Sequence, residues 1–426
     1  MANEWRVPGD FATINTALAS PMVQDYDTIR VAPGLYTNAS ELGPIIITKM
    51  VQLLGAQAGV DARTRSGDPS QESVIEIVDP NGSVQINQNH VVFDGFTVRN
   101  NTVGFGVTTS NAFSGYWIFN NIIRNNEGGL YFNNDTTVNN TISQAKFNFF
   151  DANNGPGGAG GNGIYTDLGS INVFIESNRF TGHDPAASIN FAAPASLSQR
   201  NIIISNNEMI TDNSIALTNT TNVKITGNRM TNTQGSAIFI AGGNNLTEIE
   251  RNVLHNSISN GIYVNTIFSG TPNANIRAKN NSIQGNASAG LRIDPGAYTI
   301  TPRRLDATNN WWGSPTGPTN PLNPGGTGDA VVDPDNVSEF IPFLLQDPIG
   351  PTCQELLAAC RLEVATLQRL LAADRTDLGR TQRALDACRH QLADALCRLK
   401  ECCCRLENAR KKICCLRSKH GNFFER

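Results

Sequence analysis

The segment ISNNEM at residues 204–209 is followed closely by the similar segment ITGNRM at residues 225–230. Related segments are IFNNII at 118–123, IESNRF at 175–180 and IERNVL at 249–254. Each begins with an apolar residue, has Asn at its fourth position and ends with a second apolar residue. A frame that returns this often predicts that the chain is built from repeated structural units.

The Asn of this frame recurs at intervals of 21 to 30 residues, once weaker copies of the frame are included. The full series is Asn121, Asn148, Asn178, Asn207, Asn228, Asn252, Asn281 and Asn310. Asn tolerates the left-handed backbone conformation, and its amide can bind both its own backbone and the Asn of the next unit. The series therefore predicts a ladder of stacked Asn side chains, with loops of variable length between the steps.

Each unit also has a second half, in which a small residue precedes an apolar, any, apolar triplet. Examples are GLYF at 129–132, GIYT at 163–166, GIYV at 261–264 and GLRI at 290–293. Such alternation predicts short strands with one buried face. Because no helical period separates the strands, they do not form βαβ units. They are expected to coil in parallel into an all-β solenoid.

Both frames resemble the right-handed parallel β-helix repeats of the pectate-lyase-like superfamily, over residues 1–345. Phe11, Ile14 and Leu18 at helical spacing resemble its N-terminal cap, which an open solenoid end requires because core and strand edges would otherwise be exposed. The segment ATNNWWGSPTGP at 307–318 resembles its last-coil motif. There Trp311 and Trp312 form either a lid over the last coil, which we expect, or a platform for a sugar.

The resemblance implies chemistry on acidic polysaccharides, which uses calcium-binding carboxylates with a basic group, or paired carboxylates. Residues 1–350 contain three histidines, and few carboxylates recur at one repeat position. We therefore predict no enzymatic activity, no metal site and no cofactor. If a catalytic site exists, its best candidates are Asp167, Glu176, Arg179, His183 and Asp184, with Glu176 directed outward.

The composition changes near residue 350. From residue 353 the chain lacks Pro, and an apolar residue occupies every seventh position from Leu357 to Ile413. This heptad pattern predicts a long helical coiled coil over residues 353–417, preceded by a linker at 346–352 and followed by a tail at 418–426. Additional apolar residues beside the heptad stripe favour a homo-oligomer, with a trimer preferred.

All nine cysteines lie in this second part. They are Cys353, Cys360, Cys388, Cys397, Cys402, Cys403, Cys404, Cys414 and Cys415. Disulfides between chains are the favoured use, and free thiols and metal binding are the alternatives. Copies of this chain, other cysteine-rich surface proteins and a polysaccharide are the partners that we consider.

Charge and hydropathy exclude other classes of protein. Residues 1–350 carry 18 basic and 28 acidic side chains, and residues 351–426 carry 15 and 9, so neither part predicts a nucleic-acid binder. No run of about 18 apolar residues predicts membrane insertion. The first residues lack the features of a signal peptide, which predicts synthesis in the cytoplasm.

The combined architecture resembles cysteine-rich structural proteins of the bacterial spore surface, in the coat or exosporium. That resemblance implies a rigid, non-enzymatic rod that is oligomerised and disulfide cross-linked through its coiled coil into a surface layer or fibre. Two alternatives stay open. One is a polysaccharide-binding or polysaccharide-cleaving protein, a lyase or a hydrolase, and the other is a fibre similar to a phage tailspike.

Overall fold

The computed structural model describes residues 2–137, 139–156, 158–183 and 186–350, together with residues 357, 360–366, 368, 389–394, 396 and 400–401 of the second part. The chain divides into two compact units, Met1–Ile349 and Gly350–Arg426. Among the described residues, no helix has both the length and the apolar character needed to cross a membrane.

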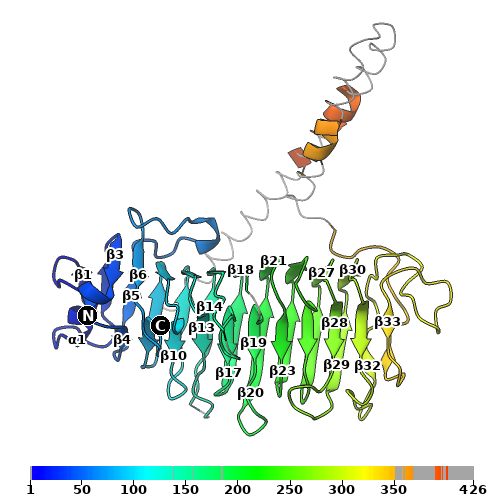
Figure 1. Cartoon of the computed structure of the whole chain (residues 1–426), viewed down its shortest axis with the longest axis horizontal. Helices are drawn as coiled ribbons and strands as arrows, with labels where there is room; N and C mark the ends of the chain where they lie inside the picture. Colours follow the sequence, from blue (N-terminus) through cyan, green and yellow to red (C-terminus); the bar gives the residue numbers. More distant parts are fainter. Residues whose placement is uncertain are drawn as a thin grey trace, which may run out of the picture. The chain divides into compact units, whose positions relative to one another are not determined.

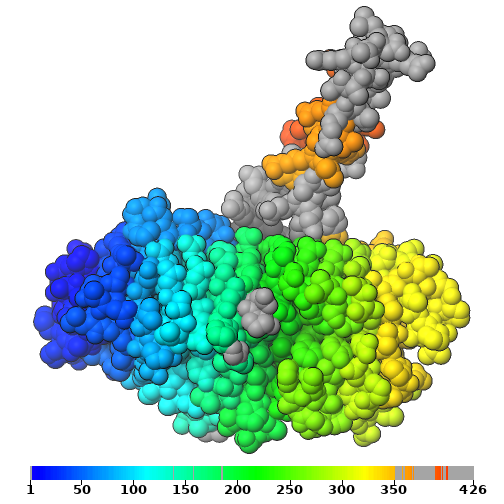
Figure 2. Space-filling model, viewed as in Figure 1, coloured from blue at the N-terminus to red at the C-terminus, as the bar shows by residue number. Residues whose placement is uncertain are grey.

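The first unit is an all-β solenoid in which every strand pairing between its coils is parallel. Its described strands form three sheets of 13, 11 and 10 strands, here called sheet A, sheet C and sheet B. The coils follow one another along the long axis of the unit, so the colours of the sequence appear as consecutive bands (Figures 1 and 2). Each coil therefore contacts mainly its two neighbours, as expected for a solenoid.

Sheet A consists of β1 (Glu4–Val7), β2 (Thr28–Val31), β5 (Gln52–Leu54), β8 (Val92–Asp94), β11 (Trp117–Phe119), β14 (Ser143–Lys146), β17 (Ser170–Glu176), β20 (Gln199–Ser205), β23 (Thr221–Thr226), β26 (Asn245–Glu250), β29 (Ala274–Lys279), β32 (Leu305–Asp306) and β34 (Ser338–Glu339). Sheet B consists of β3 (Gly34–Thr37), β6 (Ser73–Glu76), β9 (Phe96–Arg99), β12 (Ile122–Arg124), β15 (Phe149–Asp151), β18 (Arg179–Thr181), β21 (Glu208–Ile210), β24 (Arg229–Thr231), β27 (Val253–His255) and β30 (Ser282–Gln284). Sheet C consists of β4 (Ile45–Ile47), β7 (Val84–Ile86), β10 (Phe105–Thr109), β13 (Gly128–Phe132), β16 (Ile164–Thr166), β19 (Ile189–Phe191), β22 (Ile215–Leu217), β25 (Ile238–Ile240), β28 (Asn260–Val264), β31 (Ala289–Ile293) and β33 (Val331–Val332).

A single coil illustrates how the sequence pattern produces the core. The chain passes through β16 in sheet C, β17 in sheet A and β18 in sheet B, and returns to sheet C at β19. Ile175 on β17 pairs with Ile204 of the next coil, and both side chains are fully buried. The alternating apolar residues thus stack into inward rows, which supply most of the hydrophobic stabilisation.

The turn between sheets A and B contains the asparagine ladder. Asn178 Nδ2 donates to the Ala145 carbonyl at 2.9 Å and to Asn207 Oδ1 at 3.0 Å, and Asn178 Oδ1 accepts from the Asn148 backbone N–H at 3.0 Å. The same side-chain contact links all eight asparagines of the repeat frame, from Asn121 to Asn310. All eight are buried, so the ladder satisfies backbone groups that water does not reach.

A second polar ladder, which the sequence analysis missed, follows the turn between sheets B and C. Asn101 N–H donates to Asn126 Oδ1 at 3.0 Å, and Asn126 Nδ2 donates to Asn153 Oδ1 at 3.0 Å. From Asn126 on, its members lie five residues after the asparagines of the first ladder, from Asn121 to Asn281, and are buried. They include Asn126, Asn153, His183, Asp212, Thr233, Ser257 and Asn286.

Both ends of the solenoid are covered. The predicted cap is α1 (Ile14–Ala19), whose Ile14, Ala17 and Leu18 are buried, and α2 (Asn38–Glu41) joins it at this end. The other short helical element, η1 (Ala62–Thr64), lies in a loop that reaches over later coils, where Ala62 N–H donates to the Phe147 carbonyl at 3.1 Å. At the other end Trp312 is completely buried in the core. Trp312 is therefore a lid and not a sugar platform, because no ligand can reach its ring.

The predicted linker at 346–352 is partly a strap on the solenoid. Leu344 N–H donates to the Asn310 carbonyl at 3.0 Å, and Ser282 Oγ donates to Asp347 Oδ2 at 2.7 Å. The first unit consequently extends to residue 349, beyond the predicted boundary at 345. The bounds differ because these tertiary contacts join residues 34 and 65 positions apart in the sequence, which no local pattern reports.

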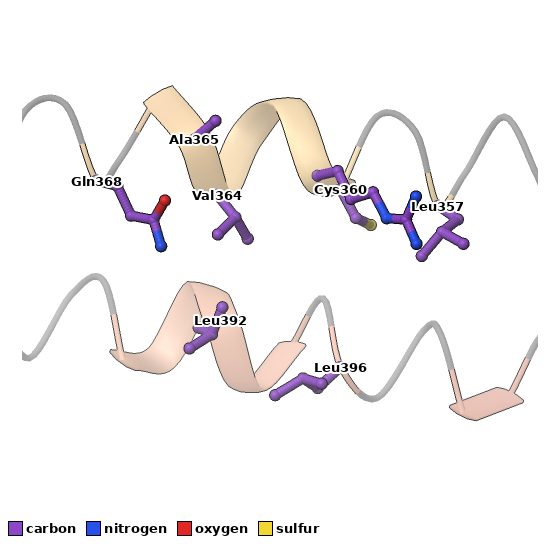
Figure 3. A pocket seen from close by; sticks show the side chains of 8 residues that line it. Leu357, Cys360, Val364, Ala365, Gln368, Leu392 and Leu396 are labelled. Atoms are coloured by element: carbon purple, nitrogen blue, oxygen red, sulfur yellow. The ribbon is translucent and has the colours of Figure 1, made fainter.

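In the second unit, the described residues do not support one long straight helix. Residues 360–366 and 389–394 are helical. Leu357, Val364, Leu392 and Leu396 line a single pocket between the two stretches (Figure 3). In a straight helix, Leu357 and Leu396 would be roughly 58 Å apart. The expected uninterrupted coiled coil over 353–417 is thus replaced, where the residues are described, by two helical stretches that face each other.

The buried ladder predicts a marked difference between two chemically identical substitutions. In Asn178→Asp, a buried carboxylate replaces the amide that donates to Ala145 and Asn207, and we expect a loss of about 3 kcal/mol in the free energy of unfolding at pH 7. In Asn201→Asp, the exposed hydrogen bond from Asn201 Nδ2 to Asn172 Oδ1 is removed. We expect the free energy of unfolding to fall by less than about 1 kcal/mol. Urea unfolding followed by circular dichroism measures both, and equal losses would contradict a stabilising role of the buried ladder.

Candidate functional site

The candidate catalytic residues of the sequence analysis do not converge. Asp167 lies beside sheet C, Glu176 points outward from sheet A, and Arg179 points outward from sheet B. Asp184 is outside the described residues. Neighbours in sequence are separated here because one coil distributes them over three faces of the solenoid.

Glu176 and Arg179 are occupied by ion pairs. Glu176 Oε2 is 2.8 Å from Lys146 Nζ, and Arg179 Nε is 3.6 Å from Glu208 Oε2. The Arg179 guanidinium also lies 5.7 Å from the centre of the Phe149 ring. Both pairs are partly exposed contacts between adjacent coils, which contribute modestly to stability.

His183 is a buried member of the second polar ladder. Its Nδ1 is 2.9 Å from Asp212 Oδ2, and Ser188 Oγ donates to the same oxygen at 3.0 Å. Burial alone would raise the pKa of Asp212, but its interactions with His183 and Ser188 lower that pKa below its ordinary value. Since His183 and Asp212 are both nearly inaccessible, this group holds a turn together and contacts no ligand.

The outer face of sheet C carries the most favourable surface for a ligand. The middle residue of each apolar, any, apolar triplet points outward there, and pairing between coils places these residues in a row. The row runs through Gln85, Thr108, Tyr131, Tyr165, Asn190, Ala216, Phe239, Tyr263 and Arg292. Aromatic side chains therefore occur at two places along the face.

Glycine allows the coils to approach closely at this face. A Cβ atom on Gly129 would lie 2.2 Å from the Gly163 carbonyl oxygen, and one on Gly163 would lie 2.5 Å from the Ser188 carbonyl oxygen. In each strand the Gly is followed by an inward apolar residue and then by the outward Tyr. The small residue of the repeat frame is thus required by the tight stacking that brings Tyr131 and Tyr165 together.

The first aromatic group, called station 1, consists of Phe105, Tyr131, Tyr165 and Asp167. The rings of Tyr131 and Tyr165 are stacked with 6.0 Å between centroids and 15° between planes, and the Phe105 ring lies 5.2 Å from that of Tyr131. Tyr131 Oη donates to Asp167 Oδ1 at 2.5 Å, and Tyr165 Oη donates to Asp167 Oδ2 at 3.4 Å. Station 1 combines apolar rings with an acceptor group on one surface.

Station 1 borders two hollows on the surface. The Tyr131 hollow is also lined by Gln85, Thr108 and Asp167, and the Tyr165 hollow by Asn190, Thr218 and Phe268. Burial raises the pKa of Tyr165 to about 12, and the nearby negative charge of Asp167 adds to that shift. Burial, followed by the hydrogen bond to Asp167, also raises the pKa of Tyr131. Both hydroxyl groups consequently stay protonated and act as hydrogen-bond donors at neutral pH.

Sequence reasoning did not select Tyr131 or Tyr165 as site residues, although a signal was present. Tyr occupies the outward position of GLYF at 129–132, GIYT at 163–166 and GIYV at 261–264. In the structure Tyr131 and Tyr263 are half-buried and Tyr165 is buried at 9% exposure. An outward position of a repeat that keeps an aromatic residue in several copies is a candidate for a binding surface.

A separate polar cluster lies on sheet B beneath the strap. His255 Nε2 is 2.7 Å from Ser282 Oγ, which donates to Asp347 Oδ2 at 2.7 Å. Burial lowers the pKa of His255 to about 4; attraction to Asp347 opposes this shift and repulsion by Arg229 adds to it. Because His255 is neutral at pH 7 and Ser282 is fully buried, the cluster fastens the strap to the solenoid.

Metal ligands and free thiols offer no further site among the described residues. No three His, Cys, Asp or Glu side chains of the described part gather in a way that would hold a metal ion. Cys360 is described, is half-buried and carries a free thiol. The other eight cysteines of the sequence analysis lie outside the described residues, and so do any contacts that they make.

Comparison with known proteins supports the fold. A family model described as the right-handed β-helix region matches residues 150–304. The catalytic unit of a thermostable α-1,3-glucanase from Streptomyces thermodiastaticus is 15% identical, with a TM-score of 0.45 over 79% of this chain and 67% of that chain. No curated protein matches the sequence. The first unit is accordingly a right-handed parallel β-helix.

Two more solved structures are similar at low identity. A mannuronic-acid-specific polysaccharide family 6 lyase from human gut microbiota is 13% identical, with a TM-score of 0.41 over 78% of this chain and 92% of that chain. The Dettilon tailspike protein is 12% identical, with a TM-score of 0.31 over 72% of this chain and 59% of that chain.

These comparisons correct one prediction. The sequence analysis predicted no enzymatic activity, but the chains of similar fold include a glucanase catalytic unit and a polysaccharide lyase. The fold therefore gives no reason to exclude catalysis, and the non-enzymatic interpretation is withdrawn. At 13–15% identity the likeness concerns the fold alone and assigns no reaction to this chain.

The buried His255 predicts a pH dependence of stability. Its pKa is about 4 in the folded chain and 6.5 ordinarily, so the unfolded chain binds a proton first as the pH falls. The contribution of His255 to the free energy of unfolding should be fully present above pH 6.5 and should fall by about 3 kcal/mol as the pH decreases to 4. Below pH 4 His255 is protonated in both states and no longer adds to the pH dependence. In His255→Gln the free energy of unfolding should decrease by about 3 kcal/mol less over the same pH range. Urea midpoints measured at a series of pH values test this, and identical slopes for both chains would contradict it.

Proposed function

We propose that this protein binds an extended polysaccharide along the outer face of sheet C and acts on it there. The observation that carries the proposal is station 1, where the rings of Phe105, Tyr131 and Tyr165 adjoin the carboxylate of Asp167. Aromatic rings pack against the apolar faces of sugar rings, and a carboxylate accepts hydrogen bonds from sugar hydroxyl groups.

The shape of the face suits a linear ligand. Coils of a parallel solenoid repeat about every 4.8 Å, so side chains of one row present similar contacts at regular steps. The Tyr131 and Tyr165 hollows follow this row and contain polar side chains such as Gln85, Thr108 and Asn190. A polymer of similar sugar units can match such a series of similar contacts along its length.

Asp167 is the group placed to exchange a proton with a bound sugar. It is the only charged residue among the described residues that line the two hollows. Tyr131 and Tyr165 hold its two carboxylate oxygens through their hydroxyl groups, which fixes the orientation of the carboxylate. Substitution by Asn retains the size of the side chain and removes the proton-transfer group.

We also propose that the second unit joins copies of the chain. Leu362 is 66% exposed and Leu396 is 57% exposed, although both belong to helical stretches with apolar positions at heptad spacing. Packing against another copy would cover these side chains. The nine cysteines would then lock the assembly by disulfides on oxidation, in a surface layer or fibre.

Loss of one ring of station 1 is the direct test of the glycan proposal. For a polysaccharide that the unsubstituted chain binds, Tyr131→Ala should raise the dissociation constant by about tenfold or more, because an aromatic contact at the centre of station 1 is lost. Asp167→Asn should lower any release of reducing ends by about a hundredfold. Affinity electrophoresis over a polysaccharide panel and a reducing-end assay measure the two effects.

The matched control is Trp117→Ala, which removes a 42%-exposed ring from the outer face of sheet A. It should leave both measurements unchanged. An equal loss in Trp117→Ala, or no binding of any polysaccharide by the unsubstituted chain, would contradict the assignment of sheet C as the binding face.

Oligomerisation is tested by light scattering with and without reductant. The full chain should be an oligomer under both conditions and should become covalently linked on oxidation, whereas a chain with all nine cysteines changed to Ser should remain a non-covalent oligomer. A monomer in reducing buffer would contradict association through the second unit.

A further inference from the structure

The outer face of sheet C has a second aromatic group, here called station 2. It consists of Phe239, Tyr263, Phe268, Arg292 and Asp294. The rings of Phe239 and Tyr263 are stacked 5.4 Å apart, and the Phe268 ring meets that of Phe239 edge-on at 5.9 Å. Phe268 is 68% exposed, so an apolar ring faces solvent at this place on the solenoid.

The two stations repeat one arrangement. Tyr131 pairs with Tyr165 of the next coil, and its hydroxyl donates to Asp167, two residues further on. Tyr263 pairs with Arg292 of the next coil, and its hydroxyl donates to Asp294, again two residues further on, at 2.5 Å. The same Tyr to Asp contact thus occurs at equivalent positions of coils that are far apart in sequence.

A hollow joins the stations. Five coil steps separate Tyr131 on β13 from Tyr263 on β28, which at the spacing of parallel strands is roughly 24 Å. The row between the aromatic groups holds Asn190 and Ala216, which are small. The Tyr165 hollow contains Tyr165 of station 1 and Phe268 of station 2 in its lining, so one depression runs between them.

The charge of this face excludes most acidic ligands. The described residues lining the two hollows include no Lys, Arg or His, and their one charged group is the carboxylate of Asp167. Arg292 is the basic residue of station 2, and its Nε is bound to Asp294 Oδ1 at 3.0 Å. The residues of 1–350 that the structure leaves undescribed, Met1, Val138, Gly157, Asp184 and Pro185, add no basic group.

A polyuronate would bring a carboxylate on every sugar to this face. It would meet the carboxylate of Asp167, which has no cation among the described residues that line the two hollows, and like charges at close range oppose binding. At station 2 the charge of Asp294 is balanced by Arg292. Residues 1–350 also carry an excess of ten acidic groups, 28 against 18 basic. An uncharged sugar meets no such electrostatic repulsion and can still contact the rings, amides and hydroxyl groups of the face.

On the basis of the proposed function, we infer that the ligand is an uncharged polysaccharide that spans both stations. The exposed ring of Phe268 and the solvent-facing edges of the Tyr131 and Tyr263 rings contact the sugars, and each Tyr-bound Asp accepts hydrogen bonds from sugar hydroxyl groups. The two stations act as linked sites, so a chain that reaches both binds more tightly than a chain that reaches one.

The first experiment compares ligand classes on the full chain. Binding is measured by affinity electrophoresis with neutral polysaccharides (a glucan, a mannan and a xylan) and with polyuronates (polygalacturonate and alginate). We expect at least one neutral polysaccharide to bind and the polyuronates to bind at least about tenfold more weakly. Tighter binding of a polyuronate would overturn this inference while leaving the proposed function intact. Binding of no polysaccharide would overturn both.

The second experiment tests whether both stations are used. Calorimetry is performed with oligosaccharides of the bound neutral polysaccharide, some shorter and some longer than the roughly 24 Å between Tyr131 and Tyr263. Phe268→Ala changes an exposed residue and should not disturb folding. It is expected to lower the affinity for the long oligosaccharides by about tenfold.

Two comparisons give this second experiment its controls. Leu246→Ala, a 47%-exposed apolar residue on sheet A, should leave all affinities unchanged. Long and short oligosaccharides with equal affinity for the unsubstituted chain would overturn the use of two stations, and so would an unchanged affinity of Phe268→Ala for the long ones.

Discussion

The hydrogen bonding of buried asparagine amides at the turns is the interaction on which the solenoid depends. Every coil has to change direction inside the molecule, and each change leaves backbone groups that neither a strand nor water satisfies. Asn178 resolves this for its coil by donating to Ala145 and Asn207 while accepting from Asn148. Because each asparagine serves the coils above and below it, the ladder also fixes the register between coils. Apolar rows can then stack only in one way.

A fixed register turns the exterior into rows of defined chemistry. Sheet A carries a chain of alternating charges, in which Lys224 and Arg277 both contact Glu248. Sheet C carries the tyrosines and their aspartate partners, with few charges besides. Both rows arise from the same repeat, and they differ only in the outward residue that each strand presents. Stability thus lies in the inward rows and turns, and the proposed recognition lies on one outer face.

The two ladders differ in how strictly they keep one residue type, and the difference explains a misleading signal. The first ladder keeps Asn at every step from Asn121 to Asn310. In the second, His183 and Asp212 replace Asn on adjacent coils and satisfy each other at 2.9 Å. A histidine with nearby carboxylates in sequence was among the best candidates for a catalytic group, should one exist, but its partner in space is the buried carboxylate of Asp212. The charged side chains near His183 in sequence, Glu176 and Arg179, point away from it on other sheets.

The sequence by itself predicted the repeat with its two recurring frames, the asparagine ladder, the N-terminal cap and, as the preferred alternative, the use of Trp312 as a lid, because each follows from a local period or motif. It did not determine the proposed binding face. The loops between strands vary in length, so Tyr131 and Asp167, 36 residues apart, meet only once their coils are stacked. For the same reason the strap of Asp347 on Ser282, across 65 residues, was not foreseen. A helical heptad pattern likewise specifies which residues are apolar but not which helix covers them, and only the tertiary structure placed Leu357 opposite Leu396. Local periodicity encodes the coil, and the stacking of coils decides which distant side chains form a site.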